Sequence, residues 1–265
     1  KFRIVVDGIN STGGIAVPNL LESLNVDVIK LNCEPNGIFD HNPEPSPNNL
    51  VKLSSLVVSE KADFGIAVDP DVDRLVFVCE DGSFFGEEYT IIAIGNYILS
   101  KQKGCTVSNL YSAVGESNVV SVMKKNNAIF GGEGSGGVIF PKLHYGRDAL
   151  VGIALFLSYF SENNLSVKEI KNTFPKYFMS KDKILLPDKF NFESFQDSII
   201  SYLNKKEKVN FIFLDGLRID YSCGSWIHIR KSNTEPIIRF IIESTTKDRM
   251  DELKYFINFY IKNLL

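Results

Sequence analysis

Short apolar runs rich in β-branched residues alternate with amphipathic stretches over the first part of the chain. The runs at 2–6, 26–31 and 64–68 are typical of buried strands, and the stretch at 16–24 has the residue spacing of a helix. Strands that alternate with helices favour a mainly parallel sheet covered by helices. We therefore expect an α/β domain over residues 1–83.

The middle of the chain predicts a second α/β domain, over residues 84–178. Helical spacing is found at 87–99 and again at 118–125, and the second of these stretches leads into a short predicted strand at 128–130. A glycine-rich loop at 131–137 follows, and another apolar helix comes after it. This order again favours helices packed on a sheet.

The last part of the chain, residues 179–265, has a different pattern. Several short apolar runs follow one another and predict an antiparallel sheet, and the closing stretch has apolar residues three and four positions apart, as in an amphipathic helix. The expected fold class is therefore α/β: two consecutive mixed-sheet α/β domains, followed by a C-terminal α+β domain with helices on an antiparallel sheet.

Length and composition limit the kinds of protein to which this chain can belong. At 265 residues the chain exceeds the ~100–200 residues of one ordinary domain, which agrees with several domains. A net charge of −3 gives no basic surface for nucleic acid, and no apolar run approaches the ~20 residues that span a bilayer. The four cysteines form no C-x-x-C pair, which argues against a zinc site. We expect a cytoplasmic protein without nucleic-acid or membrane partners.

The sequence DPDVDR places Asp69, Asp71 and Asp73 two positions apart and follows them with Arg74. Carboxylates at this spacing on a turn between two strands can converge on a hard cation such as Mg²⁺, and an arginine beside them suits a phosphate. A calcium-binding EF-hand would also have Glu80 at position 12, but Arg74 stands where its glycine is required and strands replace its helices. A solvated acidic turn remains the alternative.

Two further loops carry candidate binding residues. In GGEGSGG, Glu133 and Ser135 offer an acceptor and a donor–acceptor for sugar hydroxyls, although a plain connecting loop has the same composition. The segment 230–239 predicts a phosphate clamp on a hairpin, with a polar turn and incidental arginines as the alternative. The clamp would consist of Arg230, Ser232, Asn233, Thr234 and Arg239. His144 lies near the glycine-rich loop, beside Lys142, Arg147 and Asp148.

Taken together and in this order, the three loops resemble those of the α-D-phosphohexomutase superfamily, and the resemblance covers nearly the whole chain. DPDVDR looks like the magnesium loop of that family, GGEGSGG like its sugar-recognition loop and RKSNTEPIIR like its phosphate-binding loop. The flanking segments look closest to bacterial phosphoglucosamine mutases. Members interconvert hexose 6-phosphates and 1-phosphates through a hexose bisphosphate.

The resemblance implies a role for each matching residue. Asp69, Asp71 and Asp73 would bind Mg²⁺, and Arg74 would contact the transferring phosphoryl group. Glu133 and Ser135 would bind sugar hydroxyls, and the clamp residues would hold the phosphate that is not transferred. His144 is a candidate catalytic residue.

The sequence departs from the family pattern in three places. The family's N-terminal domain, which carries a phosphorylated serine, has no counterpart, so the chain alone is expected to be inactive. Between Leu110 and Tyr111 a further stretch is expected, which predicts a discontinuity there. Gly137 stands where some members have histidine, which leaves the role of His144 open.

Other functions remain open. Family members that act on glucose or mannose phosphates share these loops, so glucosamine phosphate is only the preferred substrate. A non-catalytic sugar-phosphate-binding protein is the runner-up from a different class. A Mg²⁺-dependent phosphatase is disfavoured because no nucleophile accompanies the metal loop.

Overall fold

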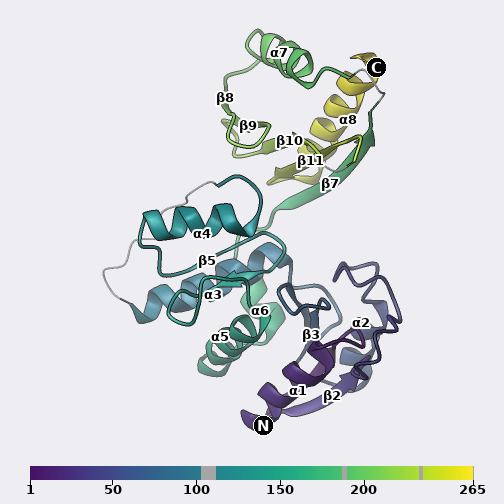
Figure 1. Cartoon of the computed structure of the whole chain (residues 1–265), viewed down its shortest axis with the longest axis vertical. Helices are drawn as coiled ribbons and strands as arrows, with labels where there is room; N and C mark the ends of the chain where they lie inside the picture. The colour runs from purple at the N-terminus through teal and green to yellow at the C-terminus, as the bar shows by residue number, and fades with distance from the viewer. Residues whose placement is uncertain (103–111, 187–189, 233–234, 265) are drawn as a thin grey trace. The chain divides into compact units, whose positions relative to one another are not determined.

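The computed structural model describes residues 1–102, 112–186, 190–232 and 235–264 (Figure 1). The chain divides into two compact units. The first comprises Lys1–Leu110 and Val114–Phe174, and the second comprises Tyr111–Ala113 and Pro175–Leu265. The discontinuity predicted at 110–111 lies outside the described residues, and the predicted boundaries after 83 and 178 stay predictions.

A four-stranded mixed sheet forms the centre of the first unit, with strand order β2-β1-β3-β4. Its strands are β1 (Arg3–Asp7), β2 (Asp27–Leu31), β3 (Phe64–Val68) and β4 (Leu75–Cys79). β1 runs parallel to β2 and β3, whereas β4 is antiparallel to β3. Because β1 and β3 are parallel neighbours, the loops that follow them emerge at the same edge of the sheet.

Helices cover this sheet on both faces. The unit contains α1 (Gly13–Ser23), α2 (Val51–Ser59), α3 (Glu87–Lys101), α4 (Glu116–Lys125), α5 (Ala149–Glu162) and α6 (Val167–Asn172), with a hairpin of β5 (Gly131–Gly132) and β6 (Val138–Ile139). One hydrophobic cluster packs α1, α3 and α5 against one face of the sheet. A second cluster packs α2 against the other face, which is formed by the alternate residues of the strands. The sheet is therefore the middle layer of this unit.

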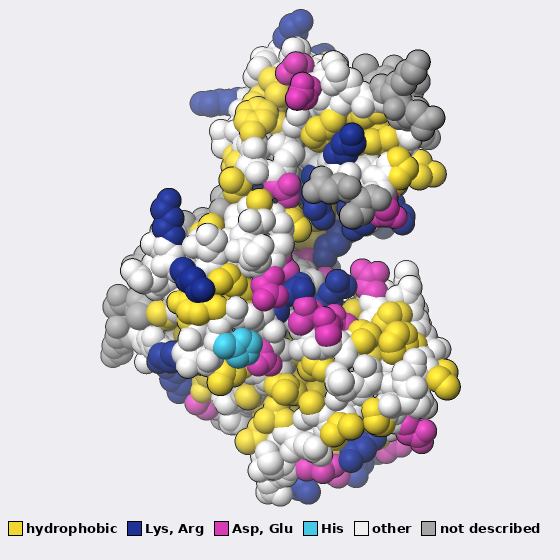
Figure 2. Space-filling model, viewed as in Figure 1, with side chains coloured by type: hydrophobic (Ala, Val, Ile, Leu, Met, Phe, Trp, Pro, Cys, Tyr) yellow, Lys and Arg dark blue, Asp and Glu magenta, His cyan; other side chains and the backbone are white. Residues whose placement is uncertain are grey.

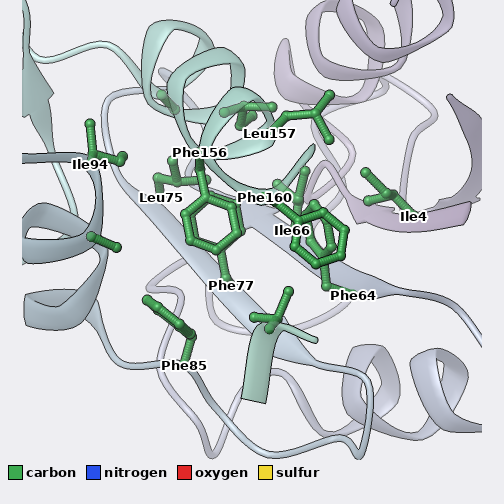
Figure 3. Packing of buried hydrophobic residues seen from close by; sticks show 14 of the residues in the cluster. Ile4, Phe64, Ile66, Leu75, Phe77, Phe85, Ile94, Phe156, Leu157 and Phe160 are labelled. Carbon is green, nitrogen blue, oxygen red and sulfur yellow. The ribbon is translucent and has the colours of Figure 1, made fainter. Parts of the chain in front are cut away.

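Aromatic side chains join the two predicted α/β segments in one core (Figure 3). Phe156 on α5 stacks on Phe77 of β4 with ring centroids 3.9 Å apart, and it meets Phe64 of β3 edge to face at 5.8 Å. Phe64, Phe77 and Phe156 are fully buried. The helix from the second segment thus completes the hydrophobic core of the first.

One predicted element is wrong in position. The strand expected at 128–130 is not formed, because the chain leaves α4 through Asn127, whose φ of 51° is left-handed, and the N–H of Ala128 donates to the carbonyl of Met123. This closing turn uses the backbone group that a strand would need. Pairing begins only at Gly131.

The second unit is an antiparallel sheet with helices, ordered β7-β11-β10-β9-β8. Its elements are β7 (Phe178–Leu185), α7 (Phe192–Leu203), β8 (Val209–Ile212), β9 (Leu217–Tyr221), β10 (Trp226–Lys231), β11 (Ile237–Ser244) and α8 (Lys247–Leu264). Alternate strand residues, among them Ile219, Ile229 and Phe240, pack with α7 and α8 in a separate core. The fold class predicted from the sequence is confirmed by this sheet and by the mixed sheet of the first unit.

The surface is mixed in character. On the face of the first unit shown in Figure 2, hydrophobic side chains lie in separate groups, and acidic and basic side chains lie side by side between them. Within the described residues, no helix has the length and apolar character needed to cross a membrane.

Candidate functional site

The metal loop, residues 69–74, connects the buried strands β3 and β4 by a tight turn. The N–H of Val72 donates to the carbonyl of Asp69 at 3.1 Å, and Val72 has a φ of 61°. A left-handed conformation is unfavourable for a β-branched residue, so the surrounding structure must hold this turn in place. Asp69 contributes directly, because its Oδ1 accepts from the N–H groups of Asp73 at 3.0 Å and Arg74 at 2.9 Å.

The turn brings the three carboxylates together. One oxygen from each of Asp69, Asp71 and Asp73 lies within 4.8 Å of the others. Burial raises the pKa of Asp69 to about 6; the backbone N–H of Arg74 opposes this rise, and the neighbouring aspartates add to it. Asp73 Oδ1 is buried and has no hydrogen-bond partner in the described part of the chain. A bound cation would reduce the repulsion between the three carboxylates and would give Asp73 Oδ1 a partner. The residues therefore fit Mg²⁺.

A second loop supports the metal loop from the same edge of the sheet. After β1, the hydroxyls of Ser11 and Thr12 both donate to the carbonyl of Pro70, at 3.0 and 2.7 Å. The buried Asp7 at the end of β1 accepts from Ile9 N at 3.0 Å and lies 3.0 Å from His41 Nε2. Sequence reasoning missed these supports, although hydroxyls directly after a strand are a usable signal.

Arg74 lies beside the carboxylates, but its Nε is not hydrogen-bonded to them. Its Nε is 3.5 Å from Asp69 Oδ2 and 4.0 Å from Asp73 Oδ1, and it makes no hydrogen bond to any described residue. The side chain is 40% exposed. A half-exposed guanidinium next to a metal loop can donate to a phosphoryl oxygen.

The sugar loop is the turn of the β5–β6 hairpin, and it lies against the start of β4. Gly136 has a φ of 80°, and a Cβ there would collide with the carbonyl oxygen of Leu75, so only glycine fits. Glu133 Oε1 accepts from the N–H of Gly115 at 3.2 Å. Ser135 Oγ is buried and is unpaired among the residues described.

Arg147 joins the two loops, although no sequence pattern distinguishes it from the polar residues beside it. Its guanidinium donates through Nη2 to Asp73 Oδ2, through Nη1 to Glu133 Oε2 at 2.6 Å and through Nε to Glu116 Oε2 at 3.2 Å. The side chain is only 18% exposed. The predicted metal and sugar residues are therefore held together by one arginine.

His144 lies near the sugar loop but makes a different contact. Its Nε2 is 2.9 Å from Asp148 Oδ2, and the imidazole is 49% exposed. Asp148 is the N-cap of α5, with Oδ1 accepting from Leu150 N at 2.7 Å and Val151 N at 3.1 Å. A catalytic role for His144 stays a prediction.

The predicted phosphate clamp lies in the second unit. Arg230 on β10 and Arg239 on β11 are direct cross-strand partners, and Arg239 donates to Glu235 at 2.9 Å. The N–H of Ser232 donates to the carbonyl of Ile237 at 2.9 Å, which closes the hairpin. Asn233 and Thr234 lie outside the described residues. The structure thus places the two arginines at directly paired positions on the strands that lead into and out of this turn.

Sequence models of three consecutive domains of one family match the chain. They are the α/β/α domain II of phosphoglucomutase/phosphomannomutase over residues 1–82, its α/β/α domain III over 95–177 and its C-terminal domain over 185–258. The chain belongs to the phosphohexomutase family. The metal loop therefore lies in family domain II, the sugar loop in domain III and the clamp in the C-terminal domain.

Relatives in this phosphohexomutase family have related names. The chain is 31% identical to the "Phosphoglucomutase/phosphomannomutase" of Thermococcus kodakarensis over 94% of its own length and 58% of the relative's. It is 30% identical to the "Probable phosphoglucosamine mutase" of Methanopyrus kandleri, over 96% of this chain and 60% of that protein. The chain thus spans about 60% of the length of the curated relatives that it matches.

Solved structures share the fold. A phosphoglucomutase/phosphomannomutase family protein from Burkholderia thailandensis has a TM-score of 0.85 at 24% identity, over 99% of this chain and 60% of that one. An Aspergillus fumigatus N-acetylphosphoglucosamine mutase has a TM-score of 0.64 at 14% identity, over 98% of this chain and 66% of that one.

Proposed function

We propose that this chain is the metal-, sugar- and phosphate-binding part of a Mg²⁺-dependent phosphohexomutase, which interconverts hexose 6-phosphate and 1-phosphate through a hexose bisphosphate. The observation that carries the proposal is the junction at Arg147, which ties a three-aspartate loop to a Glu-x-Ser loop. The alternative, a solvated acidic turn, does not explain why the sugar loop is hydrogen-bonded to the same arginine. The names of the relatives support the same reaction.

Each group then has a chemical role that suits its surroundings. Asp69, Asp71 and Asp73 would hold Mg²⁺, which when bound supplies positive charge beside the transferring phosphoryl group. Arg74 would donate to a phosphoryl oxygen from the same side. Arg239 of the clamp is exposed, whereas the Arg147 side chain is 18% exposed, so this clamp arginine can donate to the second phosphate.

The sugar would be oriented by the hairpin. Glu133 is already held by Gly115 and Arg147, so its remaining lone pairs have a fixed direction for accepting from hydroxyls. Ser135 Oγ would gain in the complex the hydrogen bond that it lacks among the described residues. His144 is proposed as an acid–base group held by Asp148.

Glucosamine phosphate is the proposed substrate, because several relatives are named phosphoglucosamine mutases. The solved N-acetylphosphoglucosamine mutase from Aspergillus fumigatus is described in complex with GlcNAc-6P and magnesium. An amino-sugar phosphate as the substrate of this chain is consistent with that complex. A cytoplasmic location stays a prediction of the sequence.

A coupled assay of the whole protein tests the proposal. With Mg²⁺ and a catalytic amount of hexose bisphosphate, kcat/KM for glucosamine 6-phosphate should exceed the values for glucose 1-phosphate and mannose 1-phosphate by about tenfold or more, equivalent to ~1.4 kcal/mol of transition-state discrimination. Equal or greater activity on the other two sugars contradicts the glucosamine assignment. Binding of all three without turnover contradicts the mutase activity and favours a non-catalytic sugar-phosphate-binding protein.

A further inference from the structure

We propose that Arg147 is a positioning residue that makes the metal loop selective for Mg²⁺ over Ca²⁺, by occupying one oxygen of Asp73 and leaving the other for the cation. The inference rests on the proposed function, because it takes the three aspartates to be a divalent-cation site. It adds a residue that contacts two of the proposed binding residues, Asp73 and Glu133.

The two oxygens of Asp73 have different surroundings. Oδ2 accepts from Arg147 Nη2, whereas Oδ1 is buried without a hydrogen-bond partner in the described ranges and lies 4.0 Å from Arg74 Nε. The contact with Arg147 uses a lone pair of Oδ2 and restricts rotation of the carboxylate, which disfavours binding of one ion by both oxygens. Asp73 is prepared to act as a one-oxygen ligand.

This restriction separates the two cations by their coordination chemistry. Mg²⁺ requires a nearly octahedral set of six oxygens at short distances, while Ca²⁺ takes six to eight oxygens and readily binds both oxygens of one carboxylate. Because both ions carry the same charge, repulsion by the Arg147 guanidinium affects both to a similar degree. The ratio of the two affinities therefore isolates the effect on coordination.

Arg147 is itself fixed by groups outside the metal loop. Glu133 Oε2 accepts from Nη1 at 2.6 Å, and Glu116 Oε2 accepts from Nε at 3.2 Å. Two carboxylates on other segments thus set the direction in which Nη2 points. Second-layer contacts of this kind tune metal sites, and their loss typically changes metal affinity about 10–100-fold.

Gly137 provides the space through which the arginine passes. A Cβ at this position would lie 2.5 Å from Arg147 Cδ and 3.2 Å from the carbonyl oxygen of Asp73. Even a methyl group must therefore displace the middle of the Arg147 side chain. Gly137→Ala moves the guanidinium without changing any charge, which makes it an independent test of the same idea.

The experiment measures displacement of Mn²⁺ by Mg²⁺ and by Ca²⁺, using the electron paramagnetic resonance signal of free Mn²⁺. Wild-type chain, Arg147→Met, Arg147→Lys and Gly137→Ala are compared after circular dichroism has shown that each is folded. We expect the ratio of Ca²⁺ to Mg²⁺ dissociation constants to fall about tenfold in Arg147→Met and in Gly137→Ala, at the low end of the range for such contacts. Arg147→Lys should retain part of the preference.

The outcomes are distinguishable. If both dissociation constants change by the same factor in Arg147→Met and Gly137→Ala, Arg147 has no role in selectivity and the inference is wrong, although the metal site stands. If Arg147→Met does not fold, Gly137→Ala alone decides by the same criterion. If the wild-type chain shows no saturable Mn²⁺ binding, the metal site of the proposed function is wrong, and the inference falls with it.

Discussion

At the scale of single residues, the site contains buried polar atoms that make no hydrogen bond to another described residue. Ser135 Oγ and Asp73 Oδ1 are buried, and neither has a partner among the described residues. Buried polar atoms without partners are rare because each costs about 1–3 kcal/mol. Both atoms lie on the two predicted binding loops, where a bound ligand is the partner that the proposed function assigns to them.

Ser135→Ala should therefore lower the affinity for a hexose phosphate without lowering the free energy of unfolding. The substitution removes a hydroxyl that contributes no hydrogen bond to a described residue, so the free energy of unfolding should be unchanged or slightly higher. Affinity for a hexose phosphate should fall about tenfold, equivalent to one hydrogen bond of ~1.4 kcal/mol. Thermal unfolding and calorimetric titration measure the two effects.

Ser54→Ala is the matched control, because Ser54 Oγ on α2 is also buried and unpaired among the described residues but lies outside the binding loops. It should leave affinity unchanged. If Ser135→Ala destabilises the fold by more than ~1 kcal/mol without altering affinity, Ser135 is a structural residue.

Site residues that are close together in the sequence could be predicted to meet, whereas those far apart could not. Asp69, Asp71 and Asp73 are two positions apart on one turn, so local geometry alone brings them together. Arg147 is 74 residues from Asp73 and 31 from Glu116, and its contacts exist only after the hairpin and α5 have packed on β4. No local pattern distinguishes such an arginine from an exposed one.

At the scale of elements, α5 connects the core to the site. Its inner face carries Phe156, and its N-terminus is capped by Asp148, which also contacts His144. The N–H of Ala149, at the first turn, donates to the carbonyl of the strained Val72 at 3.0 Å. The start of this helix therefore helps to hold the metal loop in its left-handed turn.

Asp148→Ala should weaken both functions of the helix start. Loss of the N-cap should lower the free energy of unfolding by about 1 kcal/mol, within the range of ~0.5–2 kcal/mol for such caps. Chemical denaturation measures this loss. Asn191→Ala, at the N-cap of α7, is the control: it should cost a similar amount but leave Mn²⁺ affinity unchanged, whereas Asp148→Ala should lower it. Equal Mn²⁺ affinity in both variants contradicts the link to the metal loop.

The helices were predicted well because apolar residues recur on one helix face, and the buried strands because they are short continuous apolar runs. The antiparallel direction of β4 agrees with the short connection at 69–74, since a parallel neighbour of β3 would need a crossover of about a dozen residues or more. The strand expected at 128–130 failed because a helix-closing turn, fixed by the left-handed Asn127, competes for the same backbone groups.

At the scale of the whole chain, the two compact units have separate hydrophobic cores. The first two predicted α/β segments share the core around Phe156, whereas the α+β segment has its own around Phe240. The only tryptophan of the chain, Trp226, lies on β10 in the second unit. Its fluorescence therefore reports on that unit selectively.

Phe156→Ala should lower the stability of the first unit by about 3–5 kcal/mol, as expected for a fully buried phenylalanine. Far-ultraviolet circular dichroism should show an earlier transition, while the Trp226 fluorescence transition should not move. Phe240→Ala should shift the fluorescence transition instead. An equal shift of both signals in Phe156→Ala would mean that the two cores unfold as one.

Mn²⁺ titration of Asp71→Asn tests whether the three aspartates form the cation site of a phosphohexomutase. Asp71 is exposed, so its loss should leave the unfolding midpoint unchanged, as should the control Asp251→Asn on α8. We predict one saturable Mn²⁺ site in the wild-type chain and in the control, and an affinity lower by about tenfold or more in Asp71→Asn, since each ~1.4 kcal/mol of lost interaction is a factor of ten. Equal Mn²⁺ affinity in all three proteins would contradict a cation site at these aspartates.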